Sequence, residues 1–524
     1  MKNALLFCFS IFNFVLNAQN VLPQISNISS NVDTTQKLVT ITFDALDTEN
    51  NNLDISLSIS NNNGVSFEID ASNITGDIGF PVAPGNNKSI VWNYSNLTGM
   101  SGNYTLKIVA DDRQTPSIAD LVAQVDSILL KNDMQILEGN RNYLTGAAKL
   151  NETKDTIRER FTNLGLQTST QNFTYTGFSA QNIIGKKQGH FQEGNVIIID
   201  GHFDSVEDVP GADDNASAII GVFEAARILS QYNFKKTINF IGFDLEELGL
   251  IGSKEYVNNG IKPYETIEGV LNFEMIGYYS NRKNSQSLPA GFNLLFPNAY
   301  NEVAADTFRG NFITNVANNN SASLMNAFKT NANLYVPQLR VVNVEAPGNS
   351  TMAPDLRRSD HAPFWDGGMK ALMLTDGANF RNLNYHTVND ISDSLSFTFI
   401  TNVVKATIAT AADLAQLIHA DIKTTSVNLP NVPVGIKKIK KVNDLKLSPN
   451  PADNKLTLNW EKAGIAIQNI KVMDLQGKIV YETNLTNAGI NTHTIFTEVF
   501  ASGTYILNLS GNDVNISEKF IVKH

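Results

Sequence analysis

The spacing of hydrophobic residues divides the chain into three regions. In the first, short segments place an apolar residue at roughly every second position, and turn-forming residues separate them. These segments are 38–47, 53–60, 88–94 and 104–112. Such alternation is typical of half-buried β-strands, and several short strands at this spacing predict an all-β sandwich over residues 20–130.

The second region, residues 134–420, alternates two other patterns. Residues 150–167 and 214–232 carry apolar residues three and four positions apart, which predicts amphipathic helices. Four runs are apolar almost throughout, which predicts buried strands: 195–200, 237–244, 269–274 and 370–376. The alternation indicates a central α/β domain whose mostly parallel mixed sheet is covered by helices on both faces. Residues 280–358 are polar and weakly periodic, so we expect helices and loops that cover the site.

The third region begins with a polar stretch, 421–442, which we interpret as a linker because it contains two prolines and a basic run. Residues 443–524 then return to short alternating strands. The predicted fold is therefore multidomain, with an α/β domain flanked by an N-terminal and a C-terminal all-β sandwich.

Residues 1–18 have the pattern of a secretory signal peptide. Lys2 is followed by a mostly apolar segment and then by the small residue Ala18. The apolar segment is too short to span a bilayer, so we expect no transmembrane segment after its removal. Cys8, the single cysteine, lies within it. The mature protein is expected to be exported without disulfide bonds.

The charge balance excludes one class of partner. The chain has 40 basic and 51 acidic residues and a net charge of −11, with no long basic block. We therefore expect no binding to nucleic acid.

Residues that can bind a metal ion follow each of the four predicted strands. They are His202 and Asp214, the pair Glu246–Glu247, Glu274, and His386. In open α/β sheets, ligand sites form at the carboxyl ends of the strands, so these residues are expected to converge. Imidazole and carboxylate ligands without a thiolate suit zinc. Five ligands exceed the needs of one tetrahedral ion with an open position, which favours two ions that share a carboxylate.

The neighbouring residues suggest further roles. Of the two adjacent glutamates, one can bind metal while the other acts as general base. Asp204 can orient His202, and Asp390 can do the same near His386. Tyr385 is placed to donate a hydrogen bond to a substrate carbonyl.

Six motifs together resemble the co-catalytic di-zinc aminopeptidases of the aminopeptidase Y and bacterial leucine aminopeptidase type, which are related to glutaminyl cyclases. They are GHFDSV, PGADDNAS, FDLEELGLIGS, LNFEMIGY, SDHAPFWDGG and NYHTVND. The resemblance implies two Zn²⁺ ions per domain, bridged by Asp214, with Glu246 as general base. One ion would be held by His202, Asp214 and Glu274, and the other by Asp214, Glu247 and His386.

The same resemblance implies a cis peptide after Asp214. It also implies that Asp360 and His361 line the substrate end of the site. The chain departs from the family at Glu274, where aspartate is more common.

Both flanking regions also carry resemblances. The first region resembles immunoglobulin-like or fibronectin-like accessory modules, which could contact a glycan or the cell surface. The last 80 or so residues, with SPNPADNKLTL, MDLQGKIVY and SGTYILNL, resemble the C-terminal sorting domain of type IX secretion. That resemblance implies export through the periplasm by the type IX machinery, and a secreted or outer-surface location.

Three functions remain open at this point. The first is a secreted zinc aminopeptidase that hydrolyses N-terminal residues from peptides, with a metal-bound hydroxide and a glutamate base. The second is a glutaminyl cyclase-like transferase, which would use a single zinc. The third is a catalytically inactive cell-surface binding protein, in which lost ligands would be expected. Every ligand position holds a competent residue, which favours the first.

Overall fold

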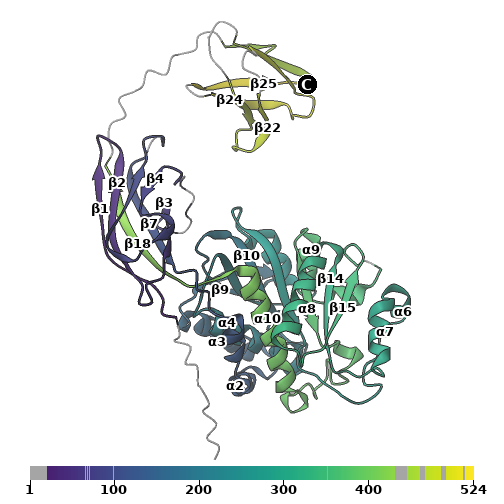
Figure 1. Ribbon diagram of the computed structural model, residues 1–524. Helices are drawn as coiled ribbons and strands as arrows, with labels where there is room; N and C mark the ends of the chain where they lie inside the picture. Colours follow the sequence, from purple (N-terminus) through teal and green to yellow (C-terminus); the bar gives the residue numbers. More distant parts are fainter. Residues whose placement is uncertain are drawn as a thin grey trace, which may run out of the picture. The chain divides into compact units, whose positions relative to one another are not determined.

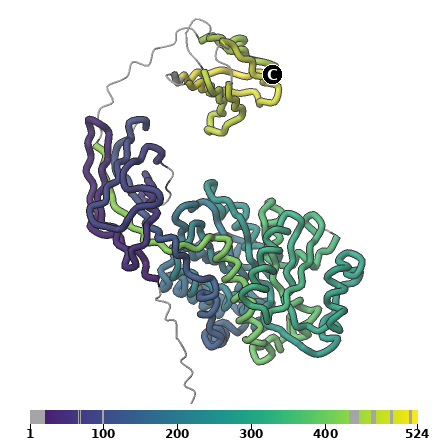
Figure 2. The backbone as a smooth tube through the Cα atoms, viewed as in Figure 1, coloured from purple at the N-terminus to yellow at the C-terminus, as the bar shows by residue number. Residues whose placement is uncertain are grey.

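The computed structural model describes residues 20–524 except 65–66, 68, 70, 98–99, 351, 431–444, 461–466, 486–490 and 512–513. The predicted signal peptide lies outside the described residues, as does most of the predicted linker. The chain divides into two compact units, one ending at Pro430 and the other beginning at Asn431 (Figures 1 and 2). The described helices include none long and apolar enough to cross a membrane.

A mixed sheet of eight strands forms the centre of the first unit. In spatial order they are β15 (Val341–Ala346), β14 (Ile313–Asn318), β16 (Ala371–Thr375), β13 (Thr266–Glu274), β10 (Gln192–His202), β12 (Lys236–Phe243), β9 (Phe178–Lys187) and β8 (Gln167–Tyr175). The central strands β16, β13, β10 and β12 run parallel to one another. The antiparallel pairs β14/β16, β9/β12 and β8/β9 lie toward the edges.

Both faces of this sheet are buried, as the apolar runs predict. Along β10, Ile197 and Ile199 point into one hydrophobic core, whereas Val196 and Ile198 point into another. This division follows from the strand period of two residues, which sends successive side chains to opposite faces.

Helices cover each face (Figure 1). The first core includes residues of α1 (Ile118–Ala123), α2 (Ser127–Leu137), α3 (Ala147–Asn163), α4 (Ser217–Leu229), α8 (Ala322–Tyr335) and α10 (Phe397–Ala415). The second core includes residues of α6 (Phe292–Leu295), α7 (Pro297–Ala305) and α9 (His361–Asp366). The short helix α5 (Ile251–Glu255) follows β12. The predicted α/β domain is thus confirmed, although residues 280–358 contain strands as well as helices and loops.

The N-terminal all-β region consists of two four-stranded sheets that share a core around Trp92. One sheet contains β1 (Gln24–Asp33), β2 (Leu38–Leu46), β6 (Gly85–Asn93) and β4 (Ile74–Gly76). The other contains β18 (Ala420–Leu429), β7 (Gly102–Asp111), β3 (Leu53–Ser60) and β5 (Gly79–Val82). The two-sheet, all-β architecture is confirmed, and its immunoglobulin-like or fibronectin-like character stays a prediction.

Two predicted boundaries of this region are wrong. The linker assigned to 421–442 begins with β18, which pairs antiparallel with β7 from Ala420↔Asp111 to Leu429↔Gly102. The sandwich also ends before residue 130, because α1 and α2 pack into the core of the α/β domain. The α/β domain is therefore inserted between β7 and β18. β18 was not predicted because residues 420–429 are mostly polar. Few side chains of this strand reach the sandwich core, so it has little need of apolar residues.

The second unit is a smaller two-sheet structure around the buried Trp460. Its first sheet contains β19 (Lys446–Ser448), β20 (Lys455–Asn459) and β23 (Thr492–Phe496). Its second contains β22 (Ile479–Asn484), β21 (Asn469–Met473), β24 (Gly503–Gly511) and β25 (Val514–Val522). Three of the five pairings between its named strands join consecutive strands, and the predicted C-terminal all-β domain is confirmed.

Candidate metal centre

The candidate ligands converge at the carboxyl ends of the parallel strands. His202 ends β10 and Glu274 ends β13, which is its neighbour in the sheet. Asp214 lies in the turn Ala212–Ala216 that precedes α4, and its own backbone angles are not helical. Glu247 follows β12, and His386 lies in the loop after β16. The expected convergence is observed, and the role of these residues as ligands stays a prediction.

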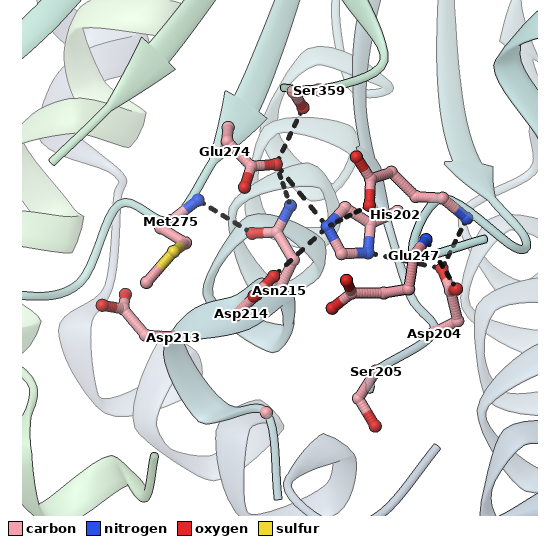
Figure 3. A network of polar contacts seen from close by, with 12 residues as sticks. His202, Asp204, Ser205, Asp213, Asp214, Asn215, Glu247, Glu274, Met275 and Ser359 are labelled. Atoms are coloured by element: carbon pink, nitrogen blue, oxygen red, sulfur yellow. Dashed lines mark hydrogen bonds and ion pairs between the residues drawn. The ribbon is translucent and has the colours of Figure 1, made fainter. Parts of the chain in front are cut away.

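Asp214 lies between the two histidines. Its Oδ1 is 3.4 Å from His202 Nε2, and its Oδ2 is 3.0 Å from His386 Nε2. His202 Nε2 is also 3.5 Å from Glu274 Oε2 (Figure 3). His386 Nε2 is 3.4 Å from Glu247 Oε2. Each oxygen of one carboxylate therefore belongs to a different group of donor atoms, as the bridging assignment requires.

These spacings suit tetrahedral metal sites. Two atoms bound to one zinc ion at about 2.0–2.1 Å with tetrahedral geometry lie about 3.3–3.4 Å apart. His202 is fully buried, and neither of its ring nitrogens has a hydrogen-bond partner within the described part of the chain. The same holds for Glu247 Oε1. Buried polar atoms usually have partners, so these donors fit a site that a cation completes.

Glu246 lies on the His202 side of the site. Its Oε2 is 3.8 Å from His202 Nε2, farther than either of the proposed carboxylate ligands there. Its side chain is close enough to Glu274 to form a possible ligand group with it and His202. The longer distance agrees with a base that stands beside the ligands.

Asp204 holds the segment that carries both glutamates. Its two carboxylate oxygens accept hydrogen bonds from the backbone N–H groups of Glu246, at 3.0 Å, and Glu247, at 3.1 Å. Its Oδ1 is also 3.3 Å from His202 Nδ1 (Figure 3). Asp204 thus contacts the histidine it was expected to orient, and it also fixes the backbone of Glu246 and Glu247.

Asp390 was expected near His386, and the structure gives it a different partner. Its carboxylate accepts hydrogen bonds from the backbone N–H groups of Asp213, at 3.0 Å, and Asp214, at 3.1 Å. The carboxylate of Asp213 faces elsewhere, toward the Gly277 N–H at 2.9 Å and the Asn382 amide at 2.7 Å. Only Asp214 of this pair therefore faces the histidines. The peptide bond between Asp214 and Asn215 is cis, as expected.

Sequence analysis missed two partners of Glu274. Ser359 Oγ donates to Glu274 Oε2 at 2.7 Å, and the Asn215 amide donates to the same oxygen at 3.3 Å (Figure 3). Ser359 lies in the motif SDHAPFW and Asn215 in the motif DDNAS. Their places in these motifs could therefore have predicted a role at the site. The two bonds hold the longer side chain of Glu274 at the metal centre.

Asp360 and His361 were expected at the substrate end. Both are fully buried, and neither lines the apolar cavity that contains Glu274, so that role stays a prediction. His361 Nε2 is 2.9 Å from the Leu356 carbonyl oxygen, and its ring packs edge-on against Trp365. They lie at the start of α9, which packs on the second core of the sheet.

Tyr385 lines an apolar cavity together with Glu274. Its ring stacks on His386 with 3.7 Å between centroids, and its hydroxyl accepts a hydrogen bond from Arg358 Nη2 at 2.7 Å. The cavity is lined mainly by apolar side chains, among them Leu288, Phe292, Phe312, Val316, Val342 and Met373. Arg358 was not among the residues predicted from sequence, because a half-exposed arginine has no distinguishing pattern.

The protonation of the site depends on burial and on its neighbours. Burial and the Asp214 charge raise the pKa of Glu247 to about 7. Burial opposes a charge on His386, but hydrogen bonds with Asp214 and Glu247 outweigh it and raise its pKa to about 10. Burial also raises the pKa of Glu246 well above its ordinary value. Ligand nitrogens must lose their protons to bind metal, so metal and protons compete for these atoms.

Comparison with known proteins identifies the family. Residues 182–411 match the model of peptidase family M28. Over 270 residues the chain is 30% identical to YfbL of Escherichia coli K12, which is described as uncharacterized, and it covers 79% of that protein. The chain belongs to peptidase family M28. The prediction of a metallo-exopeptidase is confirmed by this membership.

Other relatives of the M28 domain are matched over shorter parts. Aminopeptidase YwaD of Bacillus subtilis is 39% identical over 105 residues, which cover 20% of this chain and 23% of YwaD. Leupeptin-inactivating enzyme 1 of Streptomyces exfoliatus is 30% identical over 245 residues, 46% of each protein. The chain thus spans less than half of these two proteins. The LapA aminopeptidase structure from Legionella pneumophila aligns with a TM-score of 0.43 and 21% identity, over 57% of this chain and 74% of LapA.

The C-terminal unit is identified separately. Residues 446–523 match the secretion system C-terminal sorting domain. This match confirms the predicted sorting domain and indicates that the protein is secreted.

Proposed function

We propose that the M28 domain is a secreted zinc-dependent aminopeptidase that removes N-terminal residues from peptides. The observation that carries this proposal is the position of Asp214, whose two oxygens face His202 and His386 at 3.4 and 3.0 Å. A carboxylate shared in this way is suited to two ions, and a pair of ions about 3.5–4 Å apart is a recurring arrangement in aminopeptidases. Relatives named as aminopeptidases support the same reaction.

Different residues of the chain act at different steps of the proposed hydrolysis. When bound, two zinc ions supply Lewis acidity, which polarises the scissile carbonyl and activates water. Glu246 is the general base, because it lies beside the ligand groups and is 9% exposed. The raised pKa of its carboxyl favours retention of the proton, which Glu246 then returns to the leaving amine. Tyr385 donates its hydroxyl proton in a hydrogen bond to the carbonyl oxygen as negative charge develops there.

The cavity beside Glu274 and Tyr385 supports a preference for large apolar N-terminal residues. Its walls come from α6, β14, β15 and β16, and its apolar side chains exclude water from a bound side chain. Leu288 lies half-buried in its wall. Replacing Leu288 with tryptophan should fill the cavity and shift the ranking of substrates from leucine and phenylalanine toward alanine.

The location follows from the sorting domain together with the N-terminal signal. We propose export through the periplasm by the type IX machinery, to the medium or the outer cell surface. A contact between the N-terminal β-module and a glycan or the cell surface stays a prediction.

A panel of aminoacyl chromogenic amides and their N-blocked equivalents tests the activity. The full chain is assayed with and without a chelator, and its zinc content is measured. Cleavage of only the free-amine substrates, abolished by the chelator and restored by zinc, is expected. Cyclisation of N-terminal glutamine with a single bound zinc would favour the transferase instead. A chain that binds no metal and shows no turnover would favour the binding protein.

A further inference from the structure

We propose that Arg358 is a positioning residue that directs the hydroxyl of Tyr385 toward the substrate carbonyl. This inference rests on the proposed function, in which Tyr385 donates to that carbonyl. It adds a residue to which neither the motifs nor the predicted ligand set assigned a role.

The direction of the hydrogen bond between the two side chains is fixed by their chemistry. A guanidinium has five N–H donors and no acceptor, so the Tyr385 oxygen must accept the 2.7 Å bond from Arg358 Nη2. A phenol has only one proton to donate. Because this proton is not used toward Arg358, it stays available for another acceptor in the cavity.

The tyrosine is held at both ends. Its ring stacks on His386 at 3.7 Å with an interplanar angle of 20°, and its hydroxyl is tied to Arg358. The ring contact fixes the plane of the phenol, and the guanidinium selects the lone pair that is used. Tyr385 and Glu274 line the same cavity, so an acceptor bound in this cavity can receive the proton of the hydroxyl.

Arg358 is itself fixed in place. Its Nη1 donates to Asn379 Oδ1 at 3.0 Å, and it lies 3.5 Å from Asp355 Oδ1. Arg358 directly precedes Ser359, whose hydroxyl binds Glu274. One short segment therefore positions both a predicted metal ligand and the predicted hydrogen-bond donor.

The positive charge adds to the geometric effect. Hydrogen bonds in a chain polarise one another, so a phenol that accepts from a cation becomes a stronger donor. The benefit is largest when the substrate oxygen gains charge, and a group that acts in this way changes kcat more than KM.

A double-mutant cycle tests this inference on the full, zinc-loaded chain. The variants are R358M, Y385F and the double variant, with R358K as the conservative change. We expect R358M to lower kcat by about 10- to 100-fold with KM within about twofold, on the scale of a lost oxyanion donor or somewhat less. In the Y385F background, R358M should lower kcat less than about twofold. R358K should recover part of the loss, because lysine keeps the charge without the planar fork.

The adjacent arginine provides a matched control. Arg357 donates to Asp366 Oδ2 and to the Asn349 carbonyl oxygen, and it lies outside the cavity lining. R357M should keep wild-type kcat. The inference would be overturned if the losses in kcat caused by R358M and Y385F were fully additive in the double variant. It would also be overturned if R358M changed only KM.

A second measurement does not depend on turnover. In chain labelled with ¹³Cζ-tyrosine, the Tyr385 signal is assigned by its absence in Y385F. It should shift in R358M and stay in place in R357M, and an unmoved signal in R358M would refute the hydrogen-bond role. A wild-type chain without aminopeptidase turnover would overturn the proposed function, whereas the tyrosine signal would still decide whether Arg358 holds the hydroxyl.

Discussion

The two sides of the metal centre are built differently. On the strand side, His202 and Glu274 end two hydrogen-bonded neighbours of the sheet, β10 and β13. On the loop side, Glu247 follows β12 and His386 lies in an irregular loop with a positive φ of 55°. The His202 side chain is 0% exposed, whereas that of His386 is 35% exposed. Backbone pairing fixes one half of the site, and local side-chain contacts fix the other.

This difference has a consequence for metal binding. Strand-side ligands need little rearrangement, because the sheet holds their backbone and Asp204, Ser359 and Asn215 hold their side chains. On the loop side, His386 depends on the stacking of Tyr385 and on Asp214, and Asp204 holds the backbone of Glu247 without contacting its side chain. We therefore expect the strand side to bind metal more tightly and the loop side to exchange it faster.

The largest expected effect separates the adjacent glutamates. Glu246→Gln should lower kcat by about 10³-fold, within the range of general acid–base catalysis, while both zinc ions stay bound. Glu247→Gln should instead release the loop-side zinc, because it removes a ligand. Zinc content measured by atomic emission beside kcat distinguishes the two. Full kcat in the Glu246 variant would show that the base is assigned wrongly.

Exchanging each histidine tests the asymmetry itself. His386→Ala should reduce bound zinc from two ions to one and leave the fold intact, because its side chain is partly exposed. His202→Ala should release the strand-side zinc and lower the melting temperature clearly, because it leaves buried carboxylates without a partner. Zinc content and thermal unfolding report both effects. An equal fall in melting temperature in the two variants would contradict the comparison.

Removing the Ser359 hydroxyl should weaken only the strand side. Ser359→Ala deletes the 2.7 Å bond to Glu274 and should lower strand-side zinc affinity by about 10-fold, at the lower end of such losses. Competition with a chromophoric chelator measures this affinity. Ser394→Ala, at a half-buried serine that bonds to the Ile391 carbonyl, is the control. A change confined to the loop-side zinc would refute the assigned partner.

The smallest expected effect is a dependence of stability on pH, to which two loop-side groups contribute. The folded-state pKa is raised to about 7 for Glu247 and to about 10 for His386. The folded metal-free chain therefore binds more protons than the unfolded chain. The Glu247 contribution is present below about pH 4.3 and is lost as pH rises through about 7, while that of His386 is present below about 6.5 and is lost through about 10.

Zinc displaces these protons, so the stabilisation by zinc should grow as pH rises from about 5.5 to 8. The gap in melting temperature between zinc-loaded and metal-free chain measures it by calorimetry. Glu247→Gln should flatten the trend for the metal-free chain. A gap that is constant with pH would argue against proton displacement.

How well the sequence predicted the fold depended on burial. Strands β10, β12, β13 and β16 were located to within a few residues, because strands buried on both faces are apolar throughout. Strands β8 and β15 lie at the edges of the sheet, β9 and β14 lie next to them, and β18 closes an edge of the sandwich. Their sequences are more polar, so the pattern did not distinguish them from loops.

The same distinction applies to the site. The residues His202, Asp214, Glu247, Glu274 and His386 were found from their chemistry and from their places after apolar strands. Ser359, Asn215 and Arg358 were missed, because such side chains are common on surfaces and become informative only beside a specific partner. The role of Asp390 was wrong for a related reason, since proximity in sequence to His386 did not predict its contact with the Asp214 backbone.

The sequence by itself determined the α/β core, the candidate ligands and their order, because a buried parallel sheet imposes apolar runs and collects polar residues at its carboxyl edge. Only the tertiary structure decided that Asp390 contacts the backbone of Asp214, that β18 completes the N-terminal sandwich, and that Arg358 reaches Tyr385. These features depend on side-chain direction and on pairing between residues far apart in the chain, and neither leaves a periodic pattern in the sequence.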